Sequence, residues 1–179
     1  MKDAFTGILE EVANFFSISL RKEIRLTRIN NDTLRIWSET WRDYNKRIPP
    51  NGGWDWIDKT KLHKKKFDKK LLDFAILSEN KELCGLVLCT RSNSHEIMYI
   101  RYMEGSIYDN HSLKGLIFNI VDTVCMSYAE IYNTKKIRIV DPVNTLIPYY
   151  DLKGYVLKKG LFNRNKYCEK GVKNGDSMS

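Results

Sequence analysis

Three short apolar segments, at 72–77, 83–90 and 96–103, follow one another closely along the chain. Their length and apolar content predict β-strands, and the brief polar turns between them predict an antiparallel meander. Residues 112–132 then place apolar side chains on one face at helical spacing and predict a long amphipathic helix. A further strand is predicted at 136–140. These five segments restrict the fold to one that combines a sheet with helices.

The segment before the meander is predicted to be largely helical. Residues 3–22 place apolar side chains at helical spacing, with acidic residues early and basic residues late, and predict an amphipathic helix. A short strand is predicted at 24–29. Asn31 or Asp32 is then expected to cap a second helix. The apolar face of that helix contains Leu34, Trp37, Trp41, Tyr44 and Ile48.

Proline and glycine mark the ends of several elements. Residues 49–53 end the second helix, because neither a proline pair nor a glycine pair continues one. A lysine-rich third helix is predicted at 55–67. Near the C-terminus, a short helix is expected to begin at Pro148 and to end at Gly154. Two weak strands complete the chain, at 155–157 and 165–169.

The composition favours a single folded domain. The chain has 179 residues, of which 42% are hydrophobic, and no apolar run approaches the roughly 20 residues that a membrane helix requires. The N-terminal segment carries Asp3, Glu10 and Glu11 and has no small-residue cleavage site, which argues against a secretory signal. We therefore expect a cytoplasmic protein that has no membrane partner.

The four cysteines lack the short paired spacing that thiolate metal sites usually need. A disulfide framework would need a secreted protein. The sequence therefore predicts no metal site. Free, buried thiols are expected at Cys84, Cys89, Cys125 and Cys168.

Positive charge is concentrated in two segments of a chain whose net charge is +8. Residues 59–70 contain seven lysines and one aspartate, and residues 153–173 contain seven basic residues and one glutamate. Such a surface attracts phosphates, RNA or an acidic protein. A solvated helix face and a basic tail explain the same charges. Few aromatic residues are interleaved with them, so nucleic-acid binding is a secondary prediction.

The segment that follows the strand at 136–140 carries a specific pattern. Asn144 stands just past the strand end, and Tyr150 stands four residues before the pair Gly154 and Tyr155. This pattern resembles a signature of the GNAT superfamily of N-acetyltransferases, which runs asparagine, spacer, Tyr-x-x-x-Gly-Phe/Tyr. The predicted order of elements after the first helix is also that of the superfamily.

The resemblance covers about 24–169 and implies an α/β fold. Its mixed, mostly antiparallel central sheet is flanked by helices, and the central helix crosses over between neighbouring parallel strands. It implies an acyltransferase domain at 24–170, preceded by an additional amphipathic helix at 1–23 and followed by a flexible tail at 171–179. We expect the additional helix to pack on its own domain or to form a homodimer contact.

The resemblance implies acetyl-coenzyme A as acyl donor, bound where two parallel strands separate, with its pyrophosphate at the loop that opens the central helix. The family pattern there, Arg/Gln-x-x-Gly-x-Gly/Ala, corresponds to 110–115, which keeps the last glycine and lacks the middle one. Either a serine cap and a lysine compensate for the missing glycine, or the pocket is degenerate. The residues implied in coenzyme binding are Tyr102, Met103, Ser112, Leu113, Lys114, Gly115 and Asn144.

The same resemblance implies that Tyr150 gives a proton to the departing thiolate, since a phenol with an ordinary pKa near 10 is protonated at neutral pH. Tyr149 is its alternative. Glu104 is the candidate base, with Glu96 a more distant choice. The alternative is that Glu104 is a solvated turn residue without a catalytic role. We expect direct attack by a primary amine in a ternary complex.

In the superfamily, the first two helices of the fold and their connection usually select the acceptor. They correspond here to the second and third predicted helices, because the helix at 3–22 is an addition. Trp54, Asp55 and Trp56 lie in that connection and are predicted to bind the acceptor. Two indoles beside a carboxylate suit a cation, such as a polyamine, an aminoglycoside-like molecule, a lysine or the amine of an aminoacyl group. The two tryptophans are also explained as anchors of the third helix in the core, which is the commoner place for large aromatic side chains.

Two further functions stay open. One is a catalytically inactive GNAT-like binding module whose phosphate loop has degenerated. The other is a toxin-type acetyltransferase that acts on aminoacyl-tRNA and associates with RNA in a salt-dependent way.

Overall fold

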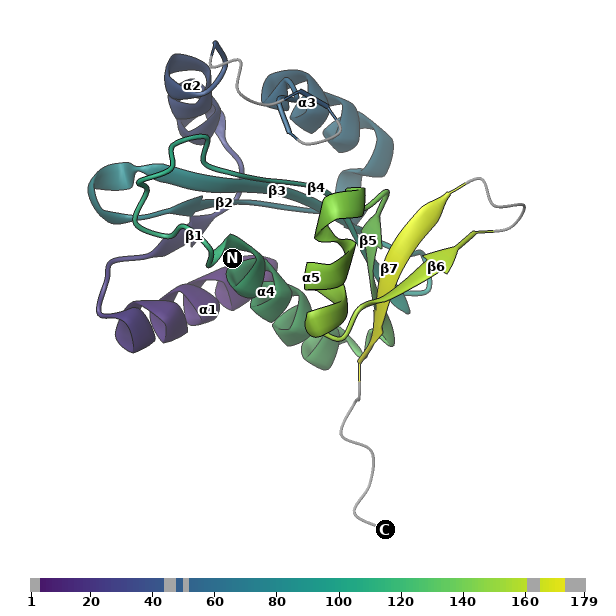
Figure 1. Cartoon of the computed structure of the whole chain (residues 1–179). Coiled ribbons are helices and arrows are strands. Elements are labelled where there is room, and N and C mark those ends of the chain that lie inside the picture. Colours follow the sequence, from purple (N-terminus) through teal and green to yellow (C-terminus); the bar gives the residue numbers. More distant parts are fainter. Residues whose placement is uncertain (1–3, 44–47, 50–51, 161–164, 173–179) are drawn as a thin grey trace.

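The computed structural model describes residues 4–43, 48–49, 52–160 and 165–172. In this part of the chain seven strands form one sheet in the order β1-β2-β3-β4-β5-β7-β6 (Figure 1). The strands are β1 (Arg25–Thr27), β2 (Leu71–Leu77), β3 (Leu83–Arg91), β4 (Ile97–Gly105), β5 (Lys136–Val140), β6 (Val156–Lys159) and β7 (Lys166–Gly171).

Neighbouring strands are antiparallel except β4 and β5, which are parallel. The mixed, mostly antiparallel sheet that the sequence predicts is therefore confirmed. Helices cover both faces: α2 and α3 lie on one side, and α1 and α4 lie on the other (Figure 1). The helices are α1 (Ala4–Leu20), α2 (Asn31–Thr40), α3 (Trp56–Phe67), α4 (Ile117–Tyr132) and α5 (Ile147–Leu152).

The cap of α2 differs from the prediction by one residue. Asn30, rather than Asn31 or Asp32, caps the helix, because its extended backbone lets its side chain accept from the Thr33 N–H while Thr33 bonds back to the Asn30 N–H. The helix ends at Thr40, well before Ile48. Tyr44, which was expected on its apolar face, lies outside the described residues.

The start of α4 also differs. Residues 112–116 form successive turns, and the helix begins at Ile117 rather than at Ser112. The reason is Gly115, whose φ of +78° lies in the left-handed region and cannot continue an α-helix. Ser112 therefore does not cap the helix, and the predicted capping role is wrong.

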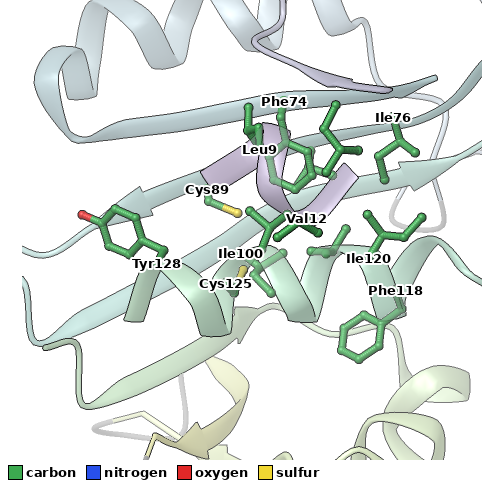
Figure 2. Close-up of a cluster of buried hydrophobic side chains, with 14 of the residues drawn as sticks. Leu9, Val12, Phe74, Ile76, Cys89, Ile100, Phe118, Ile120, Cys125 and Tyr128 are labelled. Atoms are coloured by element: carbon green, nitrogen blue, oxygen red, sulfur yellow. The ribbon is translucent and has the colours of Figure 1, made fainter. Parts of the chain in front are cut away.

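The additional N-terminal helix is part of the main core. Phe5 packs edge-on against the rings of Phe74 in β2 and Tyr128 in α4, with ring centres 6.2 and 6.1 Å apart. Leu9 and Val12 lie in the same cluster (Figure 2). Each large apolar side chain buried in this way contributes about 1.5–3 kcal/mol. The helix therefore stabilises the domain by packing against the sheet beside α4.

All four cysteines are free and buried. Cys89 and Cys125 lie in the core between the sheet and α4 (Figure 2). In the described residues, no helix is both long and apolar enough to cross a membrane.

Candidate active site

The strands β4 and β5 separate part of the way along the sheet. Their backbone pairing runs from Ile97 opposite Lys136 to Ile100 opposite Ile139, while β4 itself continues to Gly105. Beyond this point the edge of β4 has N–H and C=O groups that β5 does not use, and such an edge can pair with an extended ligand. The gap between the two strands is thus a place where a ligand can enter the sheet.

A β-bulge lies at the start of this gap. In the pairing of β3 with β4, Leu88 is opposite Tyr102 and Cys89 is opposite Ile100, so Arg101 is the extra residue. A bulge bends its strand and redirects the side chains next to it. It accounts for the divergence of β4 from β5.

The bulge also turns two consecutive side chains toward α3, although neighbours in a regular strand point to opposite faces. The Arg101 guanidinium lies 4.6 Å from the ring centre of Phe67. The Tyr102 ring centre lies 5.3 Å from that of His63. A cation and a phenol therefore share one wall of the gap.

Two cavities adjoin at the gap. The α4-side cavity has a volume of about 470 Å³ and includes Gly105, Gly115, Ile117, Phe118 and Tyr149. The α3-side cavity has a volume of about 650 Å³ and includes His63, Lys66, Phe67, Arg101, Tyr102 and Asp141. The residues that line both are Trp54, Met103, Val143 and Tyr150. A molecule in one cavity can therefore approach a molecule in the other past these shared side chains.

Tyr150 stands at the junction of the cavities. It belongs to α5, whose start is favoured by Pro148 in the first turn and whose end is followed by Gly154 with a φ of +83°. Its side chain is buried and packs against Phe118, with ring centres 5.1 Å apart. Burial, with the thiol of Cys168 as a further cause, raises the pKa of Tyr150 to about 12. The phenol is therefore protonated at neutral pH.

The N-terminus of α4 opens onto the α4-side cavity. Leu116 provides no side-chain cap, and the first N–H groups of a helix have no partner within it. Gly115, Ile117 and Phe118 line the cavity at this end. A Cβ atom on Gly115 would meet no other heavy atom within 4 Å, so the space beside it is open. These donors and this space suit an anionic group.

The other residues predicted for the phosphate loop are used differently. Leu113 is fully buried in the core. Lys114 is exposed and pairs with Asp109 at 3.3 Å. Ser112 is exposed, and its carbonyl accepts a hydrogen bond from Nζ of Lys22, just beyond α1, at 3.1 Å. The segment that follows the additional helix thus contacts the loop that precedes α4.

The two residues of β4 that were predicted to bind the coenzyme differ in the cavities that they line. Met103 lines both, whereas Tyr102 lines only the α3-side cavity. Asn144 lines neither of them. It is exposed, and its side-chain oxygen accepts a hydrogen bond from Nζ of Lys166. Its neighbours Val143 and Thr145 face the α4-side cavity instead.

Glu104 holds the segment that leads into α3. Its side chain is 4% exposed, and both carboxylate oxygens are occupied. One accepts from the indole N–H of Trp56 at 2.7 Å and the other from the backbone N–H of Gly53 at 2.8 Å. Glu104 lines neither cavity. This geometry favours an anchoring role, and its predicted role as a base has no support from its position.

Only one of the three predicted acceptor residues faces the cavities. Trp54 lines both, with its ring centre 5.1 Å from that of Tyr102. Trp56 is fully buried. Asp55 caps α3 by accepting from the Asp58 N–H at 3.0 Å, and it pairs with Arg42 at 3.0 Å. Trp56 and Asp55 thus serve the structure of α3.

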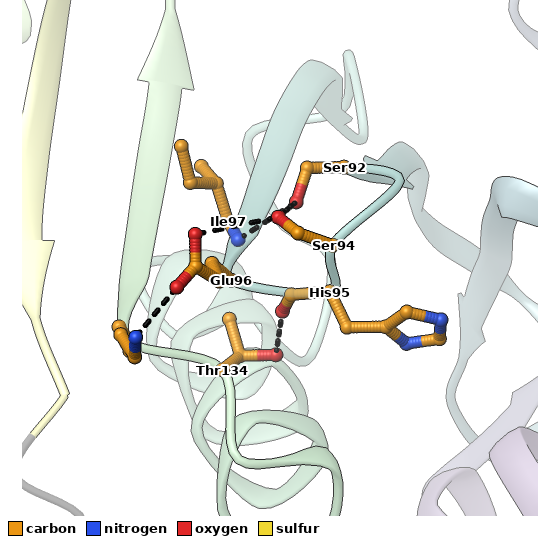
Figure 3. A network of polar contacts seen from close by, with 7 residues as sticks. Ser92, Ser94, His95, Glu96, Ile97 and Thr134 are labelled. Carbon is orange, nitrogen blue, oxygen red and sulfur yellow. Dashed lines mark hydrogen bonds and ion pairs between the residues drawn. The ribbon is translucent and has the colours of Figure 1, made fainter.

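Glu96, the more distant candidate base, lies at the other end of β4 from the gap. Its carboxylate accepts from Ser94, in the turn that joins β3 to β4, and from Lys135, just before β5 (Figure 3). The same turn contains His95, whose carbonyl accepts from Thr134 at 2.9 Å. Neither side chain lines either cavity. This polar network belongs to the turn.

His63 is the site residue that sequence reasoning missed. It lies on the buried face of α3 with Trp56 and Thr60, and it lines the α3-side cavity. Its Nδ1 lies 2.8 Å from the carbonyl oxygen of Lys59, which can only accept, so Nδ1 carries the proton and Nε2 has a free lone pair. The available signal was its spacing: a histidine among the apolar positions of a helix.

Burial is the main cause that lowers the pKa of His63, and the nearby charges of Arg101, Lys59 and Lys66 lower it further. The backbone hydrogen bond opposes this shift without reversing it. The ring is therefore neutral at pH 7, and it can accept a proton there.

His63→Gln is expected to flatten the dependence of stability on pH between pH 7 and pH 5. Below the ordinary histidine pKa of about 6.5, the unfolded chain binds a proton at His63 that the folded chain does not yet bind. Acidification therefore destabilises the wild-type protein at up to about 1.4 kcal/mol per pH unit for this group. Urea unfolding at several pH values measures the difference, and parallel curves for the two proteins would contradict it.

Comparison with known proteins bears on the fold. No protein-family model matches the sequence, and no curated protein matches it. Solved structures do match. A variant of the spermidine N-acetyltransferase SpeG from Vibrio cholerae aligns with a TM-score of 0.57 at 18% identity, over 83% of this chain and 92% of that one.

Two other structures match to a similar degree. An acetyltransferase of the GNAT family from Staphylococcus aureus has a TM-score of 0.54 at 15% identity, over 84% of this chain and 99% of that one. The ribosomal-protein-S18-alanine N-acetyltransferase from Escherichia coli has a TM-score of 0.57 at 9% identity, over 87% and 97%. With the parallel β4–β5 pair, the gap beside it and the helix order, these matches show that the chain has the fold of the GNAT N-acetyltransferases.

Proposed function

We propose that this protein is an N-acetyltransferase that moves the acetyl group of acetyl-coenzyme A to a primary amine. The observation that carries the proposal is the junction of two cavities at Tyr150, one of which opens on the N-terminus of α4. A two-substrate transfer needs two such compartments whose contents can meet. The fold supports the same reaction class, since its structural neighbours are N-acetyltransferases.

The α4-side cavity is the proposed donor site. The uncapped N-terminus of α4 would hold the pyrophosphate with backbone N–H groups. The free edge of β4 from Met103 to Gly105 would pair with the amides of the coenzyme arm. The thioester would then lie near Tyr150. In this arrangement Gly115 allows close approach, whereas Ser112, Lys114 and Asn144 are not needed for contact.

The α3-side cavity is the proposed acceptor site, and His63 is its base in place of Glu104. An ammonium has no lone pair, so Nε2 of His63 first takes a proton from it and later gives that proton to solvent. The amine nitrogen then attacks the carbonyl carbon as the C–S bond breaks. Tyr150 gives its proton to the leaving sulfur and regains one from the new amide nitrogen. The products are the acetylated amine, free coenzyme A and one released proton.

Two observations favour the alternative of an inactive binding module. The loop at 110–115 lacks the middle glycine, and Asn144 points to Lys166 instead of into a cavity. A module of this kind would keep the fold and lose affinity for the coenzyme. Transfer to aminoacyl-tRNA stays a prediction from the basic segments alone.

Thermal unfolding with acetyl-coenzyme A tests the proposed donor site. A ligand at about 100 times its Kd stabilises the native state by roughly 2.7 kcal/mol, which raises the Tm of a domain of this size by about 5–10 °C. We expect this shift with acetyl-coenzyme A and with free coenzyme A, and a smaller one with ATP. No shift at millimolar acetyl-coenzyme A would overturn the enzyme proposal and favour the inactive module.

A further inference from the structure

Arg101 is held rigidly in the wall of the α3-side cavity. Its Nε donates a hydrogen bond of 2.7 Å to Oγ1 of Thr90, which is fully buried. Its guanidinium lies 4.6 Å from the ring centre of Phe67 and 5.1 Å from that of Tyr99. These contacts fix the plane of the group. They use Nε and the faces of the guanidinium, and they leave the two terminal nitrogens at its far edge.

Two other partly covered arginines have a carboxylate partner, whereas the partly covered Arg91 contacts the ring of His95 and the carbonyl of Lys69. Arg28 pairs with Asp73 at 2.5 Å, and Arg138 pairs with Glu169 at 2.6 Å. Within the described ranges, Arg101 pairs with no acidic residue. A half-buried cation without a counter-charge is costly, and burial lowers the pKa of Arg101 accordingly. An anion that entered the cavity would relieve this cost.

The surroundings of Arg101 are also cationic. Lys66 lines the same cavity. Nζ of Lys59 donates to the Tyr102 hydroxyl at 3.1 Å, close to the same wall. Asp141, at the end of β5, is the acidic residue among those that line the cavity. The wall formed by α3 and β4 therefore repels a polycation and attracts an oxyanion.

We propose that the acceptor is a primary amine that also carries an oxyanion, a carboxylate or a phosphate, which is bound by the terminal nitrogens of Arg101 with Lys66 beside them. This inference rests on the proposed function and specifies its substrate class. A guanidinium presents two parallel N–H donors that match both anions, which explains why arginine suits this position better than lysine. Asp55, expected to attract a cationic acceptor, is already paired with Arg42 and lies outside both cavities.

A matched series of small amines tests this inference. The probes are 4-aminobutyrate, 3-aminopropylphosphonate, butylamine and 1,4-diaminobutane, which have similar lengths and differ in the group opposite the amine. The readout is the release of coenzyme A thiol from acetyl-coenzyme A. We expect kcat/KM for at least one acidic amine to exceed that for butylamine by about 10-fold or more, and 1,4-diaminobutane to be the poorest. The comparison of carboxylate with phosphonate identifies the anion.

Variants of the wall link this preference to Arg101. Arg101→Gln is expected to lower the ratio of kcat/KM for the preferred acidic amine to kcat/KM for butylamine by about 10- to 100-fold, and this ratio cancels any effect of the lost charge on His63, which acts on both amines. Arg101→Lys keeps the charge without the fork and should lose less. Lys66 is exposed, so Lys66→Gln tests the contribution of its positive charge to anion binding without risk to the fold. The control is Lys65→Gln, which removes the same charge from the same helix outside the cavity.

Three results would overturn the inference while acetyl-coenzyme A still stabilises the protein. They are equal rates for the neutral and acidic amines, a preference for 1,4-diaminobutane, and no thiol release with either acidic amine. If acetyl-coenzyme A does not stabilise the protein, the proposed function itself fails, and the inference fails with it. The Tm measurement therefore separates the two failures.

Discussion

Tyr150→Phe is expected to lower kcat by about 10²- to 10⁴-fold and to leave the affinity for acetyl-coenzyme A nearly unchanged. General acid catalysis by a positioned side chain contributes a factor of this size, and the proton is needed only in the transition state. The substitution keeps the ring that packs on Phe118, so the fold should lose little stability. The measurement is kcat with the best amine of the series above, with coenzyme affinity determined separately from the rise in Tm.

The neighbouring tyrosine provides the comparison. Tyr149 lines the α4-side cavity but not the α3-side cavity, and Tyr149→Phe should reduce kcat less than 10-fold. A large loss in Tyr149→Phe with full activity in Tyr150→Phe would exchange their roles.

Since the pKa of Tyr150 is raised to about 12, its acid form persists as pH rises, and kcat should not fall through loss of this proton below pH 10.

Gly115→Val is expected to weaken acetyl-coenzyme A binding by about 10- to 100-fold. The side chain would occupy the open space beside the N-terminus of α4, where the phosphate is proposed to lie. Misfit of this kind costs about 1–3 kcal/mol, which corresponds to that range of affinity. The ligand-induced rise in Tm or a calorimetric titration measures the change.

Backbone strain alone also destabilises this variant, so it needs a matched control. Gly154 has a φ of +83°, close to the +78° of Gly115, and it lines neither cavity. A Cβ atom there would make an ordinary contact of 3.8 Å with Lys170. Gly154→Val should therefore lose similar stability and keep its affinity for the coenzyme. Equal affinity in both variants would show that the coenzyme does not approach Gly115.

The order of elements could be read from the sequence, because periodicity and local signals determine it. Apolar alternation marks the strands, the 3.6-residue repeat marks α1 and α4, and Pro148 and Gly154 bound α5. Element boundaries were less accurate. The cap at Asn30 and the late start of α4 depend on single backbone angles, which the apolar pattern does not encode.

The site residues show the same difference between features that local sequence indicates and features that tertiary contacts decide. The motif singled out Tyr150, which lines both cavities in the structure, since a short strand–turn–helix segment has few ways to fold. The motif did not reveal that Glu104 bonds to Trp56, 48 residues away in sequence, or that Asn144 bonds to Lys166. Such partners are selected by packing between distant segments, and nothing local marks them.

The sequence by itself determined the α/β class and the helix and strand order, because these follow from local spacing and turn chemistry, and the resemblance to a family signature singled out the tyrosine of α5. Only the tertiary structure decided that α1 joins the core, that His63 and Arg101 share a cavity, and that Glu104 is an anchor. The physical reason is the bulge at Arg101 and the separation of β4 from β5. The separation depends on pairing between β4 and β5, which are far apart in sequence, and the bulge adds one residue to β4 that regular strand alternation does not predict.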